Sequence, residues 1–103
     1  RNPRFSNGFM SLDFIPLSHI RPLVQRNLQP SIENLLLYTP LTIQSIVFDI
    51  DRNEVQGDIG LQALQERHVK VNNLEEATFV AERRGISVEE YVASFGRSLQ
   101  FKY

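Results

Sequence analysis

The clearest pattern of apolar and polar positions lies in the C-terminal third of the chain. Apolar residues recur at helical spacing over residues 74–84 and again over residues 88–99. Asn73 and Ser87 stand directly before these segments, and each is followed three residues later by a glutamate, which is the pattern of a helix N-cap. Gly85, between the segments, accepts the left-handed conformation that ends a helix. The pattern therefore predicts a helix-turn-helix-like pair.

Just before this pair, apolar and polar residues alternate. Val69 and Val71 would share one face of a strand, and His68, Lys70 and Asn72 the other. The alternation predicts a short strand with an apolar face and a fully polar face.

Further strands are predicted upstream. Residues 41–50 are rich in β-branched side chains, and the apolar run at their end suggests burial on both faces. Residues 51–54 have the composition of a turn, and residues 55–61 keep apolar positions in phase with a strand. We therefore predict a hairpin over residues 41–61, and a further half-buried strand over the alternating residues 9–15.

Prolines delimit the remaining segments. They predict short helices over residues 21–28 and 30–38, whereas residues 61–66 fit either a helical turn or a continued strand. Residues 1–8 mix proline, asparagine, serine and glycine and predict an irregular arm. The fold class is thus α+β, with a small antiparallel sheet, short helices and the C-terminal pair in a single domain over residues 9–103.

The amino-acid composition restricts the kinds of site that this chain can form. The 103 residues include no cysteine and two histidines, which excludes disulfides and cysteine-based or histidine-rich metal sites. We expect no cofactor and no membrane span, since no apolar run approaches ~18 residues. The composition is compatible with the cytoplasm or with an organelle or stroma-like compartment.

Charge is unevenly distributed although the net charge is only −1. Residues 1–28 hold four arginines against one aspartate, and residues 29–66 hold six acidic side chains against one arginine. Such a separation can orient a partner. A dedicated nucleic-acid domain usually has a basic stripe and a high pI, and this chain, with a pI near 6.1, does not.

Two motifs resemble catalytic or metal-binding sequences. An apolar run ending in Asp49 and Asp51 resembles the first motif of haloacid-dehalogenase-type phosphatases, but Arg52 and Asn53 stand where that family has glycine and threonine. The same aspartates with Asn53 copy the opening of a calcium loop, yet Gly60 stands where its bidentate glutamate would be. We therefore predict a charged hairpin turn here and a protein that is not an enzyme.

The order of polar-faced strand, helix, Gly-Ile-Ser and helix over residues 67–99 resembles the ribbon-helix-helix family of DNA-binding repressors. The resemblance implies a dimer whose paired strands enter the major groove of duplex DNA. Carried over by position, His68, Lys70 and Asn72 would face base edges, and Ser87 would hold a backbone phosphate.

A protein-interaction role competes with this interpretation. The basic arm with Arg4 and Phe5, and the aromatic residues Phe95, Phe101 and Tyr103 near the other end, are candidate contacts with a protein partner. A homodimer is required for the ribbon and optional otherwise. Because the near-neutral charge is a property of the whole chain, we predict a non-enzymatic protein-interaction domain or an accessory subunit of a larger assembly. The alternative is a ribbon-helix-helix-like DNA-binding transcriptional regulator.

Overall fold

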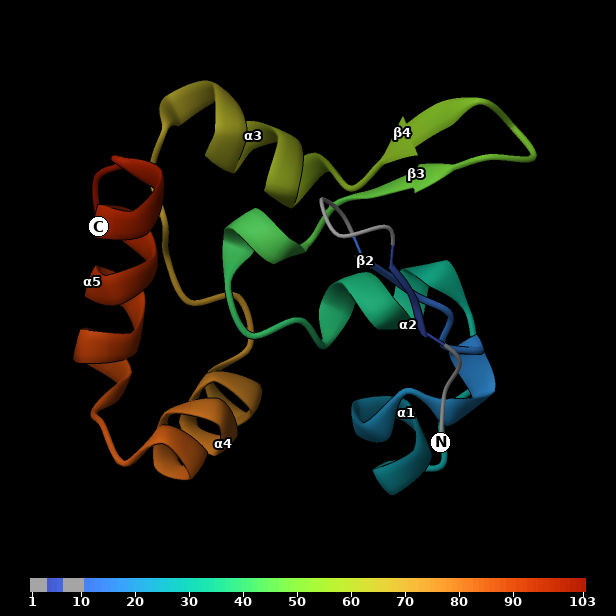
Figure 1. The fold of residues 1–103 in the computed structure, drawn as a ribbon, viewed down its shortest axis with the longest axis horizontal. Coiled ribbons are helices and arrows are strands. Elements are labelled where there is room, and N and C mark those ends of the chain that lie inside the picture. Colours follow the sequence, from blue (N-terminus) through green and yellow to red (C-terminus); the bar gives the residue numbers. More distant parts are fainter. Residues whose placement is uncertain (1–3, 7–10) are drawn as a thin grey trace. The chain divides into compact units, whose positions relative to one another are not determined.

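The computed structural model describes residues 4–6 and 11–103, and an α+β fold is confirmed for them (Figure 1). The α-helices are α1 (Arg21–Gln25), α2 (Ile32–Leu37), α3 (Asp58–Glu66), α4 (Leu74–Arg84) and α5 (Val88–Leu99). The strands are β1 (Arg4–Ser6), β2 (Ser11–Asp13), β3 (Val47–Asp49) and β4 (Glu54–Gln56). Short 3₁₀ helices span η1 (Leu17–His19) and η2 (Thr42–Gln44).

The chain divides into two compact units, Arg1–Leu35 and Leu36–Tyr103. We call them the N-terminal and the C-terminal unit. The single domain expected for residues 9–103 stays a prediction.

In the N-terminal unit, β1 pairs antiparallel with β2. Residues 4–6 therefore form a strand although an irregular arm was expected over residues 1–8; the rest of that arm lies outside the described residues. The predicted helix over residues 21–28 ends early, at Gln25, because Asn27 takes a left-handed conformation with φ of 54°.

The predicted helix pair is confirmed in the C-terminal unit, including both caps. The side chain of Asn73 accepts a hydrogen bond from the Glu76 amide at 3.0 Å, and the Ser87 hydroxyl accepts one from the Glu90 amide at 3.0 Å. Gly85 ends α4 in the left-handed conformation, with φ of 69°. Each capping side chain replaces a hydrogen-bond partner that the first turn of its helix lacks.

The core of this unit lies where α4, α5 and the segment between α3 and α4 meet. Its fully buried residues are Leu41, Val69, Ala77, Ala81 and Tyr91. Because the side chains of Ala77 and Ala81 are small, the surface of α4 leaves room for the large Tyr91 ring of α5. That ring meets Phe95 edge-on, with centroids 5.8 Å apart.

The strand predicted over residues 41–50 forms only in its second half. Thr42–Gln44 is a 3₁₀ turn because local side chains satisfy its backbone: the Gln44 side chain accepts from the Leu41 amide at 3.0 Å. The Ser45 hydroxyl donates to the Leu36 carbonyl at 2.8 Å, which anchors the turn. The burial expected on both faces is also wrong, since Phe48 is 57% exposed.

The second predicted strand, over residues 55–61, is replaced from Asp58 onward by helix α3. Gly57 turns the chain with φ of 117°, a conformation that other residues rarely adopt. The Gly60 amide then donates to the Ser45 carbonyl at 3.1 Å and holds α3 against η2. The hairpin therefore spans residues 47–56, with Phe48 opposite Val55, and residues 61–66 are helical.

Candidate functional site

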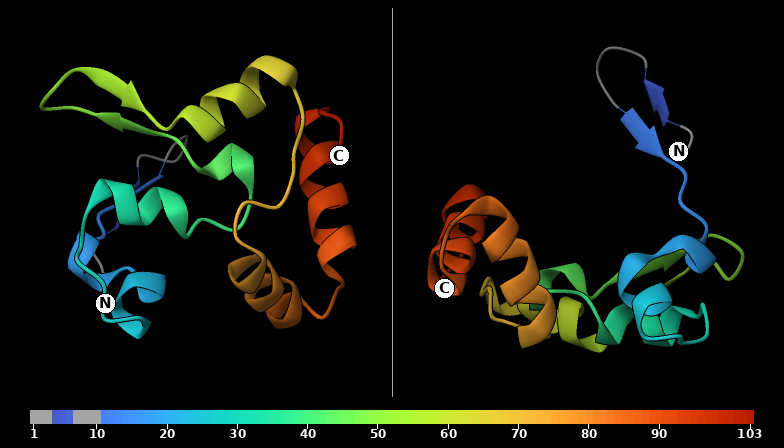
Figure 2. Two further views of the ribbon diagram at one scale, coloured as in Figure 1. Left: turned by 180° about the vertical axis from the view of Figure 1, so that it is seen from behind. Right: turned by 90° about the horizontal axis from the view of Figure 1, so that it is seen from below.

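Residues 67–72, which we call the linking segment, connect α3 to α4 and run alongside α5 (Figure 2). One edge of this segment pairs with the C-terminal tail. The Val69 amide donates to the Lys102 carbonyl at 2.8 Å, and the Lys102 amide donates to the Arg67 carbonyl at 2.8 Å. These bonds form a parallel bridge between His68 and Lys102.

The other edge of the linking segment pairs with the residues around Leu41. The Thr42 amide donates to the Lys70 carbonyl at 2.9 Å, and the Asn72 amide donates to the Pro40 carbonyl at 2.9 Å. An antiparallel bridge joins Leu41 to Val71. Within the described chain, backbone groups on both edges of this segment are thus already hydrogen-bonded, whereas a ribbon needs one edge for a second chain.

The four residues expected at DNA are placed on different surfaces. The Asn72 amide group donates to the Leu36 carbonyl at 3.0 Å and to the Thr39 hydroxyl at 3.0 Å, so it holds the loop before η2 together. Ser87 is occupied as the cap of α5. Only His68 and Lys70 lie together, on the wall of an open groove.

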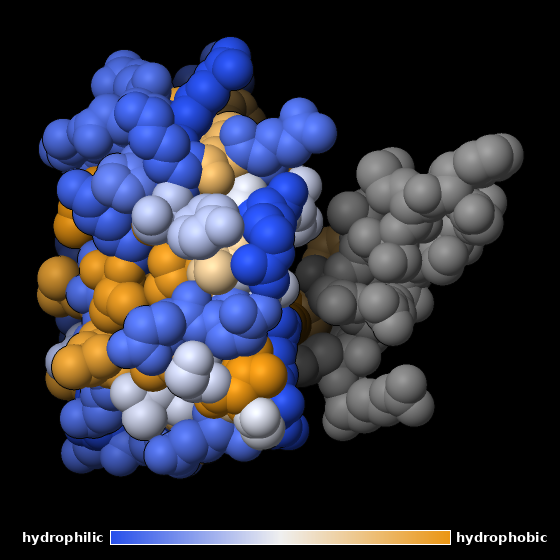
Figure 3. Space-filling view, turned by 90° about the vertical axis from the view of Figure 1, so that its left-hand side faces the viewer, coloured by the Kyte–Doolittle hydropathy of each residue, from blue (hydrophilic) through white to orange (hydrophobic). Residues whose placement is uncertain are grey.

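This groove has a volume of about 520 Å³ and is formed by the linking segment, the start of α4, the first half of α5 and the last residue. Its lining residues are His68, Val69, Lys70, Val71, Leu74, Val88, Glu89, Val92 and Tyr103. We call it the α5 groove. Figure 3 shows apolar residues gathered between hydrophilic ones on the side of the molecule that carries α5.

The α5 groove is apolar along its length and polar at its margin. Leu74 is 64% exposed and Tyr103 59% exposed, whereas Val69 beneath them is buried. Lys70 and Glu89 bring opposite charges to the margin. The groove therefore offers apolar contact area with few hydrogen-bonding groups, as binding surfaces for protein side chains do.

Gly96 explains how the tail reaches the groove. A Cβ at this position would lie only 2.9 Å from Cγ of Tyr103, so a larger residue would displace the ring. The Phe101 amide donates to the Gly96 carbonyl at 2.8 Å and fixes the turn after α5. A side-chain hydrogen bond to Glu90 and, to a lesser extent, one to Tyr103 raise the pKa of the Arg97 guanidinium above its ordinary value.

The residues expected to bind a protein partner have different surroundings. Phe95 and Phe101 are half-buried and pack against the core. Tyr103 is mostly exposed and lines the α5 groove. The side chains of Arg4 and Phe5 lie outside those that the structure describes.

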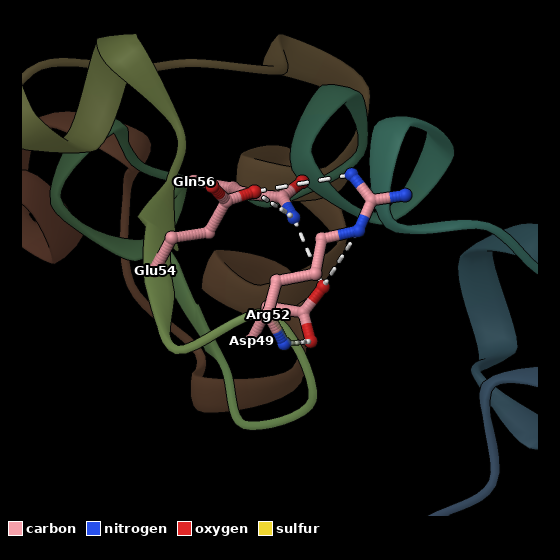
Figure 4. A network of polar contacts seen from close by, with 4 residues as sticks. All are labelled: Asp49, Arg52, Glu54 and Gln56. Carbon is pink, nitrogen blue, oxygen red and sulfur yellow. Dashed lines mark hydrogen bonds and ion pairs between the residues drawn. The ribbon is translucent and has the colours of Figure 1, made fainter.

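Two carboxylates of the hairpin, those of Asp49 and Glu54, are held by neighbouring side chains (Figure 4). The Gln56 amide group donates to Asp49 at 3.1 Å, and the Arg52 guanidinium lies 3.8 Å from Asp49 and 3.8 Å from Glu54. In the part of the chain that the structure describes, no three histidine, aspartate or glutamate side chains are grouped to hold a metal ion.

Sequence reasoning missed most of the groove. Helical spacing alone predicts a core position for Leu74, Val88 and Val92; the two valines do pack against the core, but Leu74 is largely exposed. The sequence does contain a signal for this exposure. Leu74 follows the Asn73 cap directly and so lies on the first turn of α4, where no preceding turn of the helix shields its side chain.

Comparisons with known proteins give no relative: no protein-family model, no curated protein and no solved structure matches the chain. Among the described residues, no helix has the length and apolar character needed to cross a membrane.

Proposed function

We propose that this chain is a non-enzymatic protein-interaction domain or an accessory subunit of a larger assembly, and that the α5 groove receives apolar side chains of its protein partner. The observation that carries the proposal is the position of Leu74, an exposed leucine on the edge of an apolar groove. Covering such a side chain contributes about 1–2 kcal/mol to binding.

The buried core also holds the side chains of the groove in place, which favours recognition of a partner of one shape. Val71, Val88 and Val92 line it on one side and pack against the buried core on the other. A partner would therefore meet a surface whose side chains are already ordered, so that little conformational entropy is lost on binding.

The geometry gives less support to the DNA-binding alternative. The backbone of the linking segment is hydrogen-bonded on both edges, and Asn72 is engaged inside its own loop. Two glutamates, Glu89 and Glu90, occupy the first turn of α5, where the resemblance requires a phosphate. Like charges at that end would repel it.

Cross-linking tests the proposed role. We expect a photoreactive phenylalanine analogue in place of Leu74 to form a discrete adduct with one protein in the source cells, and Leu74→Asp to weaken binding of that protein by about tenfold or more. The matched control is Leu99, an exposed leucine of α5 that does not line the groove. Adducts at Leu99 that equal those at Leu74 would contradict the proposal.

Duplex DNA provides the second measurement. A repressor with several phosphate contacts should lose affinity steeply as salt rises, whereas we expect no measurable binding at any salt concentration. Saturable, salt-sensitive binding that the double variant His68→Ala/Lys70→Ala abolishes would favour the DNA-binding alternative instead.

A further inference from the structure

The β3–β4 hairpin has an apolar face whose side chains are more than half exposed. Phe48 and Val55 are directly opposite in the register, so their side chains share one face. They are 57% and 53% exposed, and Ile50, directly after β3, is 82% exposed. In Figure 1 the two strands and their turn extend away from α3.

The opposite face accounts for the shape of the hairpin. Asp49 and Glu54 are cross-strand neighbours, and two carboxylates in this position repel each other. Arg52 lies within 3.8 Å of both, and the Gln56 amide group donates to both, at 3.1 Å and 3.4 Å (Figure 4). These polar contacts stabilise the turn, so the hairpin can form without burial of its apolar face.

The segment that carries the apolar face is acidic. Residues 47–58 contain four carboxylates, from Asp49, Asp51, Glu54 and Asp58, and one cation, Arg52. Arg52 is engaged with Asp49 and Glu54. The carboxylates of Asp51 and Asp58 make no hydrogen bond or ion pair with any described residue, so their charge is available to a binding partner.

We propose that this hairpin is a second docking surface, separate from the α5 groove, and that it binds a cationic protein segment in which apolar side chains alternate with lysine or arginine. The apolar side chains of that segment cover Phe48, Ile50 and Val55. Its cations lie beside Asp51 and Asp58, where opposite charges steer the encounter and fix the orientation.

Charge selects this occupant over the others. Two copies of the chain that met through their hairpins would bring two acidic surfaces together, which opposes association. Nucleic acid and anionic lipid surfaces are negative and would be repelled for the same reason. A cationic protein segment satisfies both the apolar face and the carboxylates around it.

The test is a titration of the isotope-labelled full chain with short synthetic peptides, followed by NMR. The probe peptide alternates lysine with leucine, and the two comparison peptides alternate glutamate with leucine and lysine with serine. We expect amide shifts confined to residues 47–58 with the lysine–leucine peptide alone, and an affinity that falls as salt rises to about 0.5 M.

Variants separate the contribution of apolar contact from that of charge. Ile50→Ser should weaken the lysine–leucine peptide by about tenfold, and Asp51→Asn by about threefold. The matched controls are Leu64→Ser on α3 and Glu82→Gln on α4, which should leave the affinity unchanged. The groove variant Leu74→Asp should also bind normally, so that failure here is distinct from failure of the groove proposal.

Three results would each overturn the inference. They are shifts scattered over the whole surface, equal binding of the glutamate–leucine peptide, and an affinity that Ile50→Ser leaves unchanged. Each would mean that the hairpin does not recognise the combination of apolar contact and positive charge.

Discussion

Replacing Gly60 with alanine is expected to lower the free energy of unfolding by about 2 kcal/mol, although alanine is the better helix former. Gly60 lies in helix α3 and is buried against η2. A Cβ here would lie 2.5 Å from the Ser45 carbonyl oxygen and 2.6 Å from Cβ of Ile46. Because a backbone oxygen cannot rotate away, α3 would have to shift. Urea denaturation with a far-UV circular dichroism readout measures the change.

The other helical glycine supplies the control for Gly60→Ala. Gly96 is also buried, but the group nearest to an added Cβ is the ring of Tyr103, a side chain that is 59% exposed. We expect Gly96→Ala to cost less than about 1 kcal/mol, since the exposed Tyr103 and the short tail that carries it can move away while the helix gains propensity. A Gly60→Ala variant that is more stable than the original chain would show that α3 does not pack closely on Ser45.

The helix pair could be predicted because its signals are local. Asn73, Ser87 and Gly85 act on amides and carbonyls within a few residues of themselves, so the same chemistry is visible in the sequence and in the structure. Helix α4 accordingly begins and ends where its cap and Gly85 predict, and α5 begins directly after its serine cap.

The region from residue 41 to residue 61 could not be predicted in the same way. Its β-branched residues favour a strand locally, but the hydroxyl of Ser45 binds the Leu36 carbonyl and the Gly60 amide binds the Ser45 carbonyl. Both contacts join residues that are nine or more positions apart. They depend on the folded arrangement, and propensity alone does not contain them.

The α5 groove, too, could be predicted from the sequence only in part. The alternation with two valines predicts that His68 and Lys70 share a face, and both line the α5 groove. Periodicity predicts which side chains share a face, but it does not predict what lies opposite that face. Helical spacing puts Leu74 and Val92 among the apolar positions of their helices; Val92 packs against the core and also lines the groove, whereas Leu74 is largely exposed on the groove wall.

Truncating Tyr91 to alanine is expected to lower the free energy of unfolding by about 3–5 kcal/mol, the usual range for removing a buried aromatic ring. Tyr91 is 1% exposed, its ring meets Phe95, and the Arg84 guanidinium lies 5.2 Å from the ring centre. A domain of this size has a total stability of roughly 5–15 kcal/mol, so the variant would be close to unfolding. Urea denaturation measures the loss.

The conservative variant Tyr91→Phe is the control and should change stability by less than about 1.5 kcal/mol, because it keeps the ring. The same core supports the α5 groove, since Val88 and Val92 pack against it. Tyr91→Ala should therefore weaken a partner bound in the groove even where the protein remains folded, whereas Leu74→Asp should weaken binding without loss of stability. If Tyr91→Ala destabilised the chain and left groove binding intact, the groove would not depend on the core beneath it, and the partner would have to bind elsewhere on the molecule.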